Sequence, residues 1–151
     1  MRPIPSLAEV EAYLHGNIPL SAAMDVRVIA CAADGVILRA PLAPNINPHS
    51  MVFGGSTSAV AILSAWTWLN FALQSAGHAS RLVIQRSAVD YTAPITGEFE
   101  ARCAGLVVGQ FEEFIRTLDR YSKARATLSA ELTCNGEMVA TFTGDYVAAR
   151  E

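Results

Sequence analysis

A loop rich in Asn, His and Gly runs directly into a long apolar segment, in the stretch NINPHSMVFGGSTSAVAILSAWTWL that begins at Asn45. Gly54 and Gly55 precede the apolar segment, and a ligand can approach their backbone closely because they carry no side chains. If a helix begins here, its first backbone N–H groups and its dipole can stabilise negative charge developing on a carbonyl oxygen. The same glycines could simply form a turn before a helix that Ser56 caps.

Two polar side chains of the loop could take part in such chemistry. The amide of Asn47 could hold a water molecule or a substrate oxygen, although an Asx turn beside Pro48 would use the same group. The ordinary pKa of histidine suits His49 to act as a general base near neutral pH, although most loop histidines only face solvent. A serine nucleophile is not expected, because GGSTS does not contain the G-x-S-x-G elbow.

A further acidic candidate lies in the stretch SAVDYTAP, which reads as the end of a strand. With a period of two, Asp90 is expected to share one face of that strand with Leu82, Ile84, Arg86 and Ala88. An acid among apolar neighbours needs a physical reason. Asp90 could be a general base, or it could form an ion pair with Arg86.

The remaining chain predicts the elements that would position these groups. A capping box at Ser6–Glu9 starts a short helix, and the turns Asp34-Gly35 and Asn135-Gly136 each join two strands. A long helix is predicted over about 56–76, strands over 81–94 and 97–105, and an amphipathic helix over 111–121. Strands joined by hairpins make a largely antiparallel sheet, and the long helix is expected to cover its apolar face, with Trp66 and Leu69 buried.

The long apolar helix could also be read as a membrane span, because no Asp, Glu, Lys or Arg occurs between Arg39 and Arg81. Several polar side chains are scattered through it, and no cluster of Lys and Arg flanks it. We therefore expect a buried core helix, and no membrane association.

Composition narrows the class of protein. A length of 151 residues suits a single domain over 1–151, and a net charge of −3 without a basic stripe argues against nucleic-acid binding. The three cysteines lie far apart, which argues against a disulfide framework and against a zinc site. We expect a reduced, cytoplasmic protein without a signal peptide, and predict no metal or cofactor.

Four sequence fragments together resemble a known family. NIN, then VFGGS opening the long helix, then YTAPITG at a strand end, and GDYV near the C-terminus are similar to the hotdog-fold thioesterase-like domain that lies C-terminal to an acetyltransferase domain in some bacteria. The resemblance extends from about Leu20 to Val147. It implies an α+β hotdog fold, in which an antiparallel sheet wraps around a long central helix.

The resemblance also implies roles for individual residues. In hotdog acyl-CoA thioesterases this loop carries an Asn and then His-Gly-Gly, so Asn47 matches the Asn, Gly54 and Gly55 match the glycines, and Phe53 stands where the His would be. No acid occurs on the helix, where such enzymes often carry one. The general base is therefore left to His49 or Asp90.

The implied activity is hydrolysis of acyl-CoA or acyl-carrier thioesters. The amides of Gly54 and Gly55 would polarise the carbonyl, with Phe53, Ser56 and Arg86 beside the substrate. A hydratase or dehydratase of acyl thioesters with the same fold, and a non-catalytic acyl-binding module, remain as alternatives. The family further implies a homodimer or higher homo-oligomer with its site at the subunit boundary.

Overall fold

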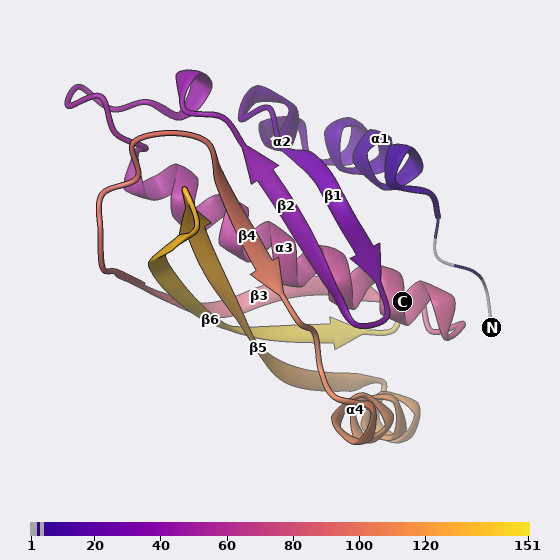
Figure 1. The fold of residues 1–151 in the computed structure, drawn as a ribbon. Helices are drawn as coiled ribbons and strands as arrows, with labels where there is room; N and C mark the ends of the chain where they lie inside the picture. Colours follow the sequence, from indigo (N-terminus) through magenta and orange to yellow (C-terminus); the bar gives the residue numbers. More distant parts are fainter. Residues whose placement is uncertain (1–2, 4) are drawn as a thin grey trace.

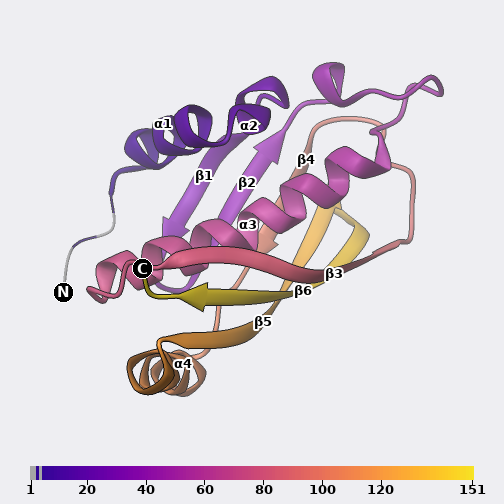
Figure 2. The same cartoon turned by 180° about the vertical axis from the view of Figure 1, so that it is seen from behind.

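The structure is a computed structural model that describes residue 3 and residues 5–151. Residues 1, 2 and 4, at the start of the predicted domain, lie outside the described residues. Within the described part, six antiparallel strands form one sheet in the order β1-β2-β4-β5-β6-β3, and this sheet curls around the long helix α3 (Figures 1 and 2). The α+β hotdog fold predicted from the sequence is confirmed.

The elements follow the predicted order, with additions. The strands are β1 (Arg27–Ala32), β2 (Gly35–Ala40), β3 (Arg81–Tyr91), β4 (Phe99–Cys103), β5 (Lys123–Cys134) and β6 (Glu137–Ala149). The helices are α1 (Leu7–Asn17), α2 (Pro19–Ala23), η1 (Ala43–Asn45), α3 (Gly54–Ser75) and α4 (Val108–Tyr121). The short helices α2 and η1 were not predicted.

Helix α3 lies across the concave face of the sheet, and 12 of its 22 residues are buried (Figure 2). It begins two residues earlier than predicted, with Phe53 in the N-cap position, so the prediction that Ser56 caps the helix is wrong. Leu69 is buried as predicted. Trp66 is only half-buried and donates its indole N–H to the carbonyl oxygen of Leu82 at 3.0 Å. None of the helices in the described residues is long and apolar enough to cross a membrane.

Strand β3 contains a β-bulge. After the bulge, side chains lie on the opposite face of the sheet from the one that simple alternation predicts. The register against β6 shifts between Ile84 and Arg86, which leaves Gln85 as the extra residue. Before the bulge, Ile84 lies opposite the buried Tyr146, whereas after it Asp90 lies opposite the exposed Thr141. The prediction that Asp90 shares a face with Leu82 and Ile84 is therefore wrong. Asp90, Arg86 and Ala88 share the outer face of the sheet instead.

The strand pairing also departs from a simple series of hairpins. The two hairpins β1–β2 and β5–β6 form as predicted, and Asn135 and Gly136 take φ values of 53° and 78°. Strands β3 and β4 are consecutive in the sequence but do not pair. β3 pairs with β6 at the sheet edge, and β4 lies between β2 and β5.

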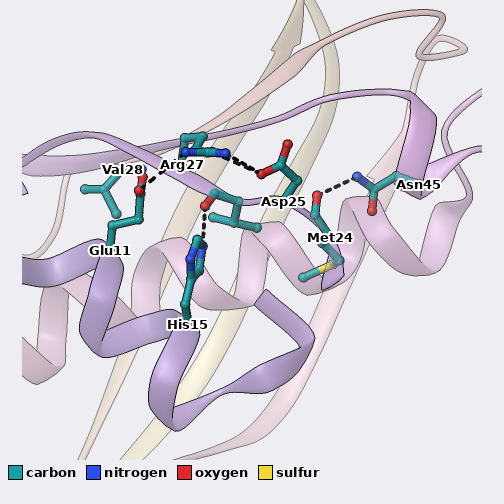
Figure 3. Close-up of polar contacts among 8 residues, drawn as sticks. Glu11, His15, Met24, Asp25, Arg27, Val28 and Asn45 are labelled. Carbon is teal, nitrogen blue, oxygen red and sulfur yellow. Dashed lines mark hydrogen bonds and ion pairs between the residues drawn. The ribbon is translucent and has the colours of Figure 1, made fainter. Parts of the chain in front are cut away.

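The two edges of the sheet differ in how their backbone groups are used. At the β1 edge, His15 of α1 bonds the carbonyl oxygen of Val26 through Nε2 at 2.7 Å, and the backbone N–H of Val28 donates to a carboxylate oxygen of Glu11 at 3.0 Å (Figure 3). Helix α1 therefore closes this edge. The opposite edge is the 11-residue strand β3, which pairs only with β6.

Candidate active site

The loop before α3 is a small irregular hairpin. An isolated bridge joins Ile46 to Val52, and the N–H of Asn47 donates to the carbonyl oxygen of Met51 at 2.7 Å. Ser50 takes a positive φ of 60°, which closes the tip. The N–H of Val52 reaches the carbonyl oxygen of Ile95 at 2.8 Å and so ties the hairpin to the segment after β3.

Asn45 anchors the base of this hairpin. Its side chain is buried, and its Nδ2 donates to the carbonyl oxygen of Met24 at 2.9 Å (Figure 3) and also to that of Pro41 at 2.8 Å. Its own carbonyl oxygen accepts the N–H of Phe53 at 2.8 Å. Asn45 therefore has a structural role.

Asn47 uses one end of its amide to shape the loop. Its Oδ1 accepts the N–H of His49 at 2.8 Å and that of Met51 at 3.2 Å, which is the Asx-turn arrangement. Its Nδ2 has no hydrogen-bond partner within the described residues. Asn47 can therefore offer only donors to a ligand while the loop keeps this shape.

His49 lies near the tip of the hairpin and is exposed. No hydrogen bond or ion pair fixes its ring within the described residues. Its position is set by the Asx turn that receives its backbone N–H. The imidazole is accessible from solvent, and no partner among the described residues selects one tautomer.

The first turn of α3 presents two open backbone donors. The N–H groups of Gly54 and Gly55 have no acceptor within the described residues, and no side chain caps the helix. The next two N–H groups, of Ser56 and Thr57, both donate to the carbonyl oxygen of Phe53, at 2.9 and 3.2 Å. The open pair therefore lies at the positive end of a 22-residue helix dipole.

The side chain of Phe53 accounts for the glycine at position 55. A Cβ built at Gly55 would lie 2.3 Å from the Phe53 ring, so only glycine fits beneath the ring as it stands. The ring is itself 59% exposed and so presents an apolar surface beside the two open N–H groups. Gly54 is less restricted, because a Cβ there would meet the Tyr91 ring at an ordinary contact distance of 3.6 Å.

Tyr91 is a site residue that the sequence analysis did not single out. Its hydroxyl donates to the carbonyl oxygen of Gly54 at 2.8 Å, which links the end of β3 to the first turn of α3. It lies within the YTAPITG fragment, but nothing in the sequence spacing brings it to a residue 37 positions earlier.

Thr57 is a second residue that was missed. It is 1% exposed, one turn into α3, and its hydroxyl has no hydrogen-bond partner in the part of the chain that the structure describes. A buried polar atom without a partner marks a place where a water molecule or a ligand group is expected.

Asp90 and Arg86 lie on the outer face of β3, and both are exposed. They do not form the ion pair that was considered from the sequence, and neither is bonded to His49 within the described residues. A single chain therefore brings together Gly54, Gly55, Phe53 and Tyr91, but leaves Asp90 on the side of the sheet away from α3. The described residues contain no group of His, Cys, Asp and Glu that could hold a metal ion.

A family model and several solved structures match this chain. Residues 7–150 match the family described as "Putative thioesterase (yiiD_Cterm)". A protein of unknown function from Chlorobaculum tepidum TLS has a similar structure at 25% identity, with a TM-score of 0.91 over 95% of this chain and 94% of that chain. A "putative thioesterase" from Shewanella oneidensis is 28% identical, with a TM-score of 0.85 over 95% of this chain and 96% of that one.

A third structure, from Pseudomonas aeruginosa and named a "probable thioesterase", shares the fold at 18% identity. Its TM-score is 0.81, and 99% of each chain is covered. The resemblance predicted from NIN, VFGGS, YTAPITG and GDYV is confirmed. The chain belongs to the yiiD_Cterm thioesterase family and has the hotdog fold.

Proposed function

We propose that the protein hydrolyses acyl-CoA or acyl-carrier thioesters by direct attack of water. The observation that carries this proposal is the pair of unpartnered N–H groups of Gly54 and Gly55 at the N-terminus of α3. Two backbone donors at the positive end of a helix are suited to the oxyanion that forms when water adds to a thioester carbonyl. Membership of a thioesterase family supports the same reaction.

The group that activates water must come from outside α3. The helix contains no Asp, Glu or His, so we assign this role to His49 of the loop or to Asp90 of β3. The open Nδ2 of Asn47 could hold the attacking water or the thioester. Phe53 and Ser56 would contact the substrate from the first turn of the helix, and Arg86 would bind a CoA phosphate.

We further propose a homodimer that pairs the β3 strands of two copies. The β1 edge is closed by α1, whereas β3 leaves an 11-residue edge unpaired, and unpaired edges are usually covered or paired. Pairing at β3 would place Asp90 at the boundary between subunits and so allow it to approach the partner's loop. The three free thiols fit a reducing compartment, and we place the protein in the cytoplasm.

Thiol release from a panel of acyl-CoAs and acyl-carrier thioesters tests the function directly. We expect free thiol to form in proportion to enzyme, with a preference among acyl chains. A change in unsaturation without thiol release would instead identify a hydratase or dehydratase. Saturable binding of acyl-CoA without either reaction would identify an acyl-binding module, which the absence of an acid from α3 favours as the second candidate.

The assignment of the base is tested by two separate substitutions, His49→Ala and Asp90→Asn. The residue that activates water should lower kcat by at least about tenfold when changed, because general acid–base roles contribute roughly a hundredfold or more. Both side chains are exposed, so neither substitution should unfold the protein. If both variants keep the wild-type kcat, the base is neither residue.

A further inference from the structure

A cavity of about 570 Å³ lies between the C-terminal half of α3 and the helix α4. The β1–β2 turn and the loop before α4 complete its wall. The lining is mainly apolar: Cys31, Ala32, Ala33, Trp68, Phe71, Ala72, Ala76, Leu106, Val108, Phe111 and Ile115, with Ser75, Glu112 and Arg116 as its polar members. Its volume and apolar character fall in the range of small-molecule binding sites.

The cavity lies where α4 packs mainly against β5 and meets α3 at the Phe111 ring, which lies edge-on to the Trp68 ring with 5.7 Å between the ring centroids. Phe114 and Leu118 are buried on the side of α4 that meets β5, and Figure 1 shows the helix beside the start of that strand. Phe111 and Ile115 are only partly buried and line the cavity instead. Opposite them, α3 presents small residues at Ala72 and Ala76, which cannot fill the gap.

The inner wall offers little to bind a polar ligand. The indole N–H of Trp68 already donates to the carbonyl oxygen of Ala33 at 3.1 Å. The buried side-chain atoms without partners in the described residues belong to other positions, namely Asn45, Thr57, Thr67 and Asn70. A ligand inside the cavity would therefore be recognised by its apolar part.

Charged side chains occur only at the mouth of the cavity. Glu112 and Arg116 are exposed and lie one turn apart on α4, beside the exposed Val108. Arg116 is engaged by Glu113 at 2.8 Å, but both side chains are largely in solvent, so the pair is weak and can rearrange. An anionic head group at the mouth would meet this guanidinium.

The shape of the wall indicates the kind of apolar group. The lining residues on this side run from Trp68 in α3 to Ala76 at its C-cap, which corresponds to about 12 Å along the helix axis. A trough of this length, apolar inside and with Glu112 and Arg116 at its mouth, fits an unbranched hydrocarbon chain whose carboxylate or thioester end reaches Arg116. The trough is separate from the first turn of α3, because Gly54 and Trp68 are about 21 Å apart along the axis.

We propose that the cavity between α3 and α4 binds the hydrocarbon chain of an acyl compound, with its polar end beside Arg116. This inference rests on the proposed function only for the origin of the hydrocarbon chain. That chain belongs either to the acyl thioester or to the free fatty acid. Binding itself does not require hydrolysis. The site is thus a second acyl-binding position, distinct from the open N–H groups of Gly54 and Gly55.

Trp68 provides a direct readout, because it lines the cavity and the chain contains only two tryptophans. In a Trp66→Phe variant, Trp68 is the only tryptophan, so the tryptophan emission reports on the cavity wall alone. Its emission should change saturably with dodecanoate, with S-dodecyl-CoA (a thioether that cannot be hydrolysed), or with both. Response to dodecanoate alone identifies the free acid as the ligand, and response to S-dodecyl-CoA alone identifies the thioester.

Ala72→Leu, in the same Trp66→Phe background, tests whether the response comes from the cavity. The larger side chain would project into the empty space, so binding should weaken at least tenfold while the melting temperature stays equal or rises. Arg116→Gln should weaken dodecanoate binding about two- to fivefold and leave binding of dodecanol unchanged. Arg120→Gln, on the same helix but outside the cavity lining, is the matched control and should have no effect.

Two results would overturn the inference. One is a Trp68 emission that responds to neither ligand, and the other is binding that survives Ala72→Leu. Failure of the proposed hydrolysis would appear separately, as absence of thiol release from a protein that still binds dodecanoate.

Discussion

At the scale of single residues, hydrogen-bond partners distinguish side chains that are free to meet a ligand from side chains that only hold the fold. Asn45 and Asn47 belong to the same NIN fragment, yet the buried Nδ2 of Asn45 is used by two carbonyl oxygens, whereas that of Asn47 is unpartnered. Ser56 looked like a cap in the sequence but lies inside the first turn. The open hydrogen-bonding groups of the candidate site are mainly backbone N–H groups, which residue types alone do not reveal.

The amide of Gly54 can be removed without removing the helix. Proline is well tolerated at the first helical position, and Phe53 before it has a ψ of 132°, which suits a residue that precedes proline. Gly54→Pro deletes one N–H, whereas Gly54→Ala keeps it and adds a Cβ at an ordinary contact distance of 3.6 Å. We expect Gly54→Pro to lower kcat about a hundredfold to a thousandfold, as for loss of one oxyanion donor.

The control for this prediction is Gly54→Ala, which should stay close to wild type in thiol-release assays. Circular dichroism should show the same helix content for both variants. Equal activity of the proline and alanine variants would remove the Gly54 N–H from the mechanism. The same comparison at position 55 is less direct, because any Cβ there displaces the Phe53 ring.

Tyr146 predicts how stability depends on alkaline pH. Its side chain is fully buried and donates to the carbonyl oxygen of Ile62 at 2.6 Å. Burial, and secondarily the nearby Cys103, raise the pKa of Tyr146 well above its ordinary value. The folded state then keeps a proton that the unfolded chain loses above about pH 10, so the free energy of unfolding falls by about 1.4 kcal/mol per pH unit there.

Tyr146→Phe should remove this slope. At neutral pH the variant should be less stable by about 1 kcal/mol, because one hydrogen bond is lost. The two stability curves should meet near pH 11, where the alkaline loss of the wild type has offset that bond. Urea unfolding between pH 7 and pH 12 measures both curves. Tyr121→Phe, at a tyrosine that is 64% exposed, should run parallel to the wild type.

At the scale of elements, α3 carries two buried threonine hydroxyls, on Thr57 and Thr67, that have no hydrogen-bond partner among residue 3 and residues 5–151. Replacing such a hydroxyl by a methyl group is expected to be neutral or stabilising. Both Thr57→Val and Thr67→Val should therefore melt at or slightly above the wild-type temperature. Their effect on activity should differ, because only Thr57 lies in the turn next to Gly54 and Gly55.

We expect Thr57→Val to lower kcat about tenfold, because the variant loses one hydrogen bond to a water molecule or substrate group. Thr67→Val, a matched change ten residues along the same helix, should leave kcat unaltered. Thiol release and thermal melting measure the two effects independently. If both variants retain full activity, the Thr57 hydroxyl takes no part in the reaction.

Elements with local signals were predicted well from the sequence. Asn135 and Gly136 adopt the left-handed conformations that a tight hairpin turn needs, and Ser6 accepts the N–H of Glu9 as its capping box requires. In β4, the alternation of apolar and charged residues matches the burial, because Phe99, Ala101 and Cys103 are buried and Glu100 and Arg102 between them are not. These features depend only on residues close together in the chain.

Features that depend on distant partners were not predicted. The bulge at Gln85 follows from the register of β3 on β6, and it moved Asp90 to the face opposite the one that a period of two predicts. Tyr91 reaches Gly54 only because the sheet curls around α3. The loop of the candidate site could therefore be picked out in the sequence, whereas the contacts of its residues could not.

At the scale of the whole molecule, the two edges of the sheet set the expected assembly. Strand β1 has its outer edge bonded by Glu11 and His15, whereas β3 pairs on one side only. A two-fold dimer is the commonest closed assembly, and pairing two β3 strands would continue the sheet from one subunit into the next. Asp90, exposed on β3, would then lie near the boundary.

The dimer predicts that activity depends on assembly. Val83 is 51% exposed on β3, so Val83→Lys should leave the fold intact while two like charges and the gain of hydration oppose pairing. We expect light scattering coupled to size exclusion to give a dimer mass for the wild type and a monomer mass for Val83→Lys. Thiol release should fall in step with the dimer fraction on dilution, and Val83→Thr should behave as wild type. A wild-type protein that is monomeric at micromolar concentration and fully active would refute a site shared between subunits.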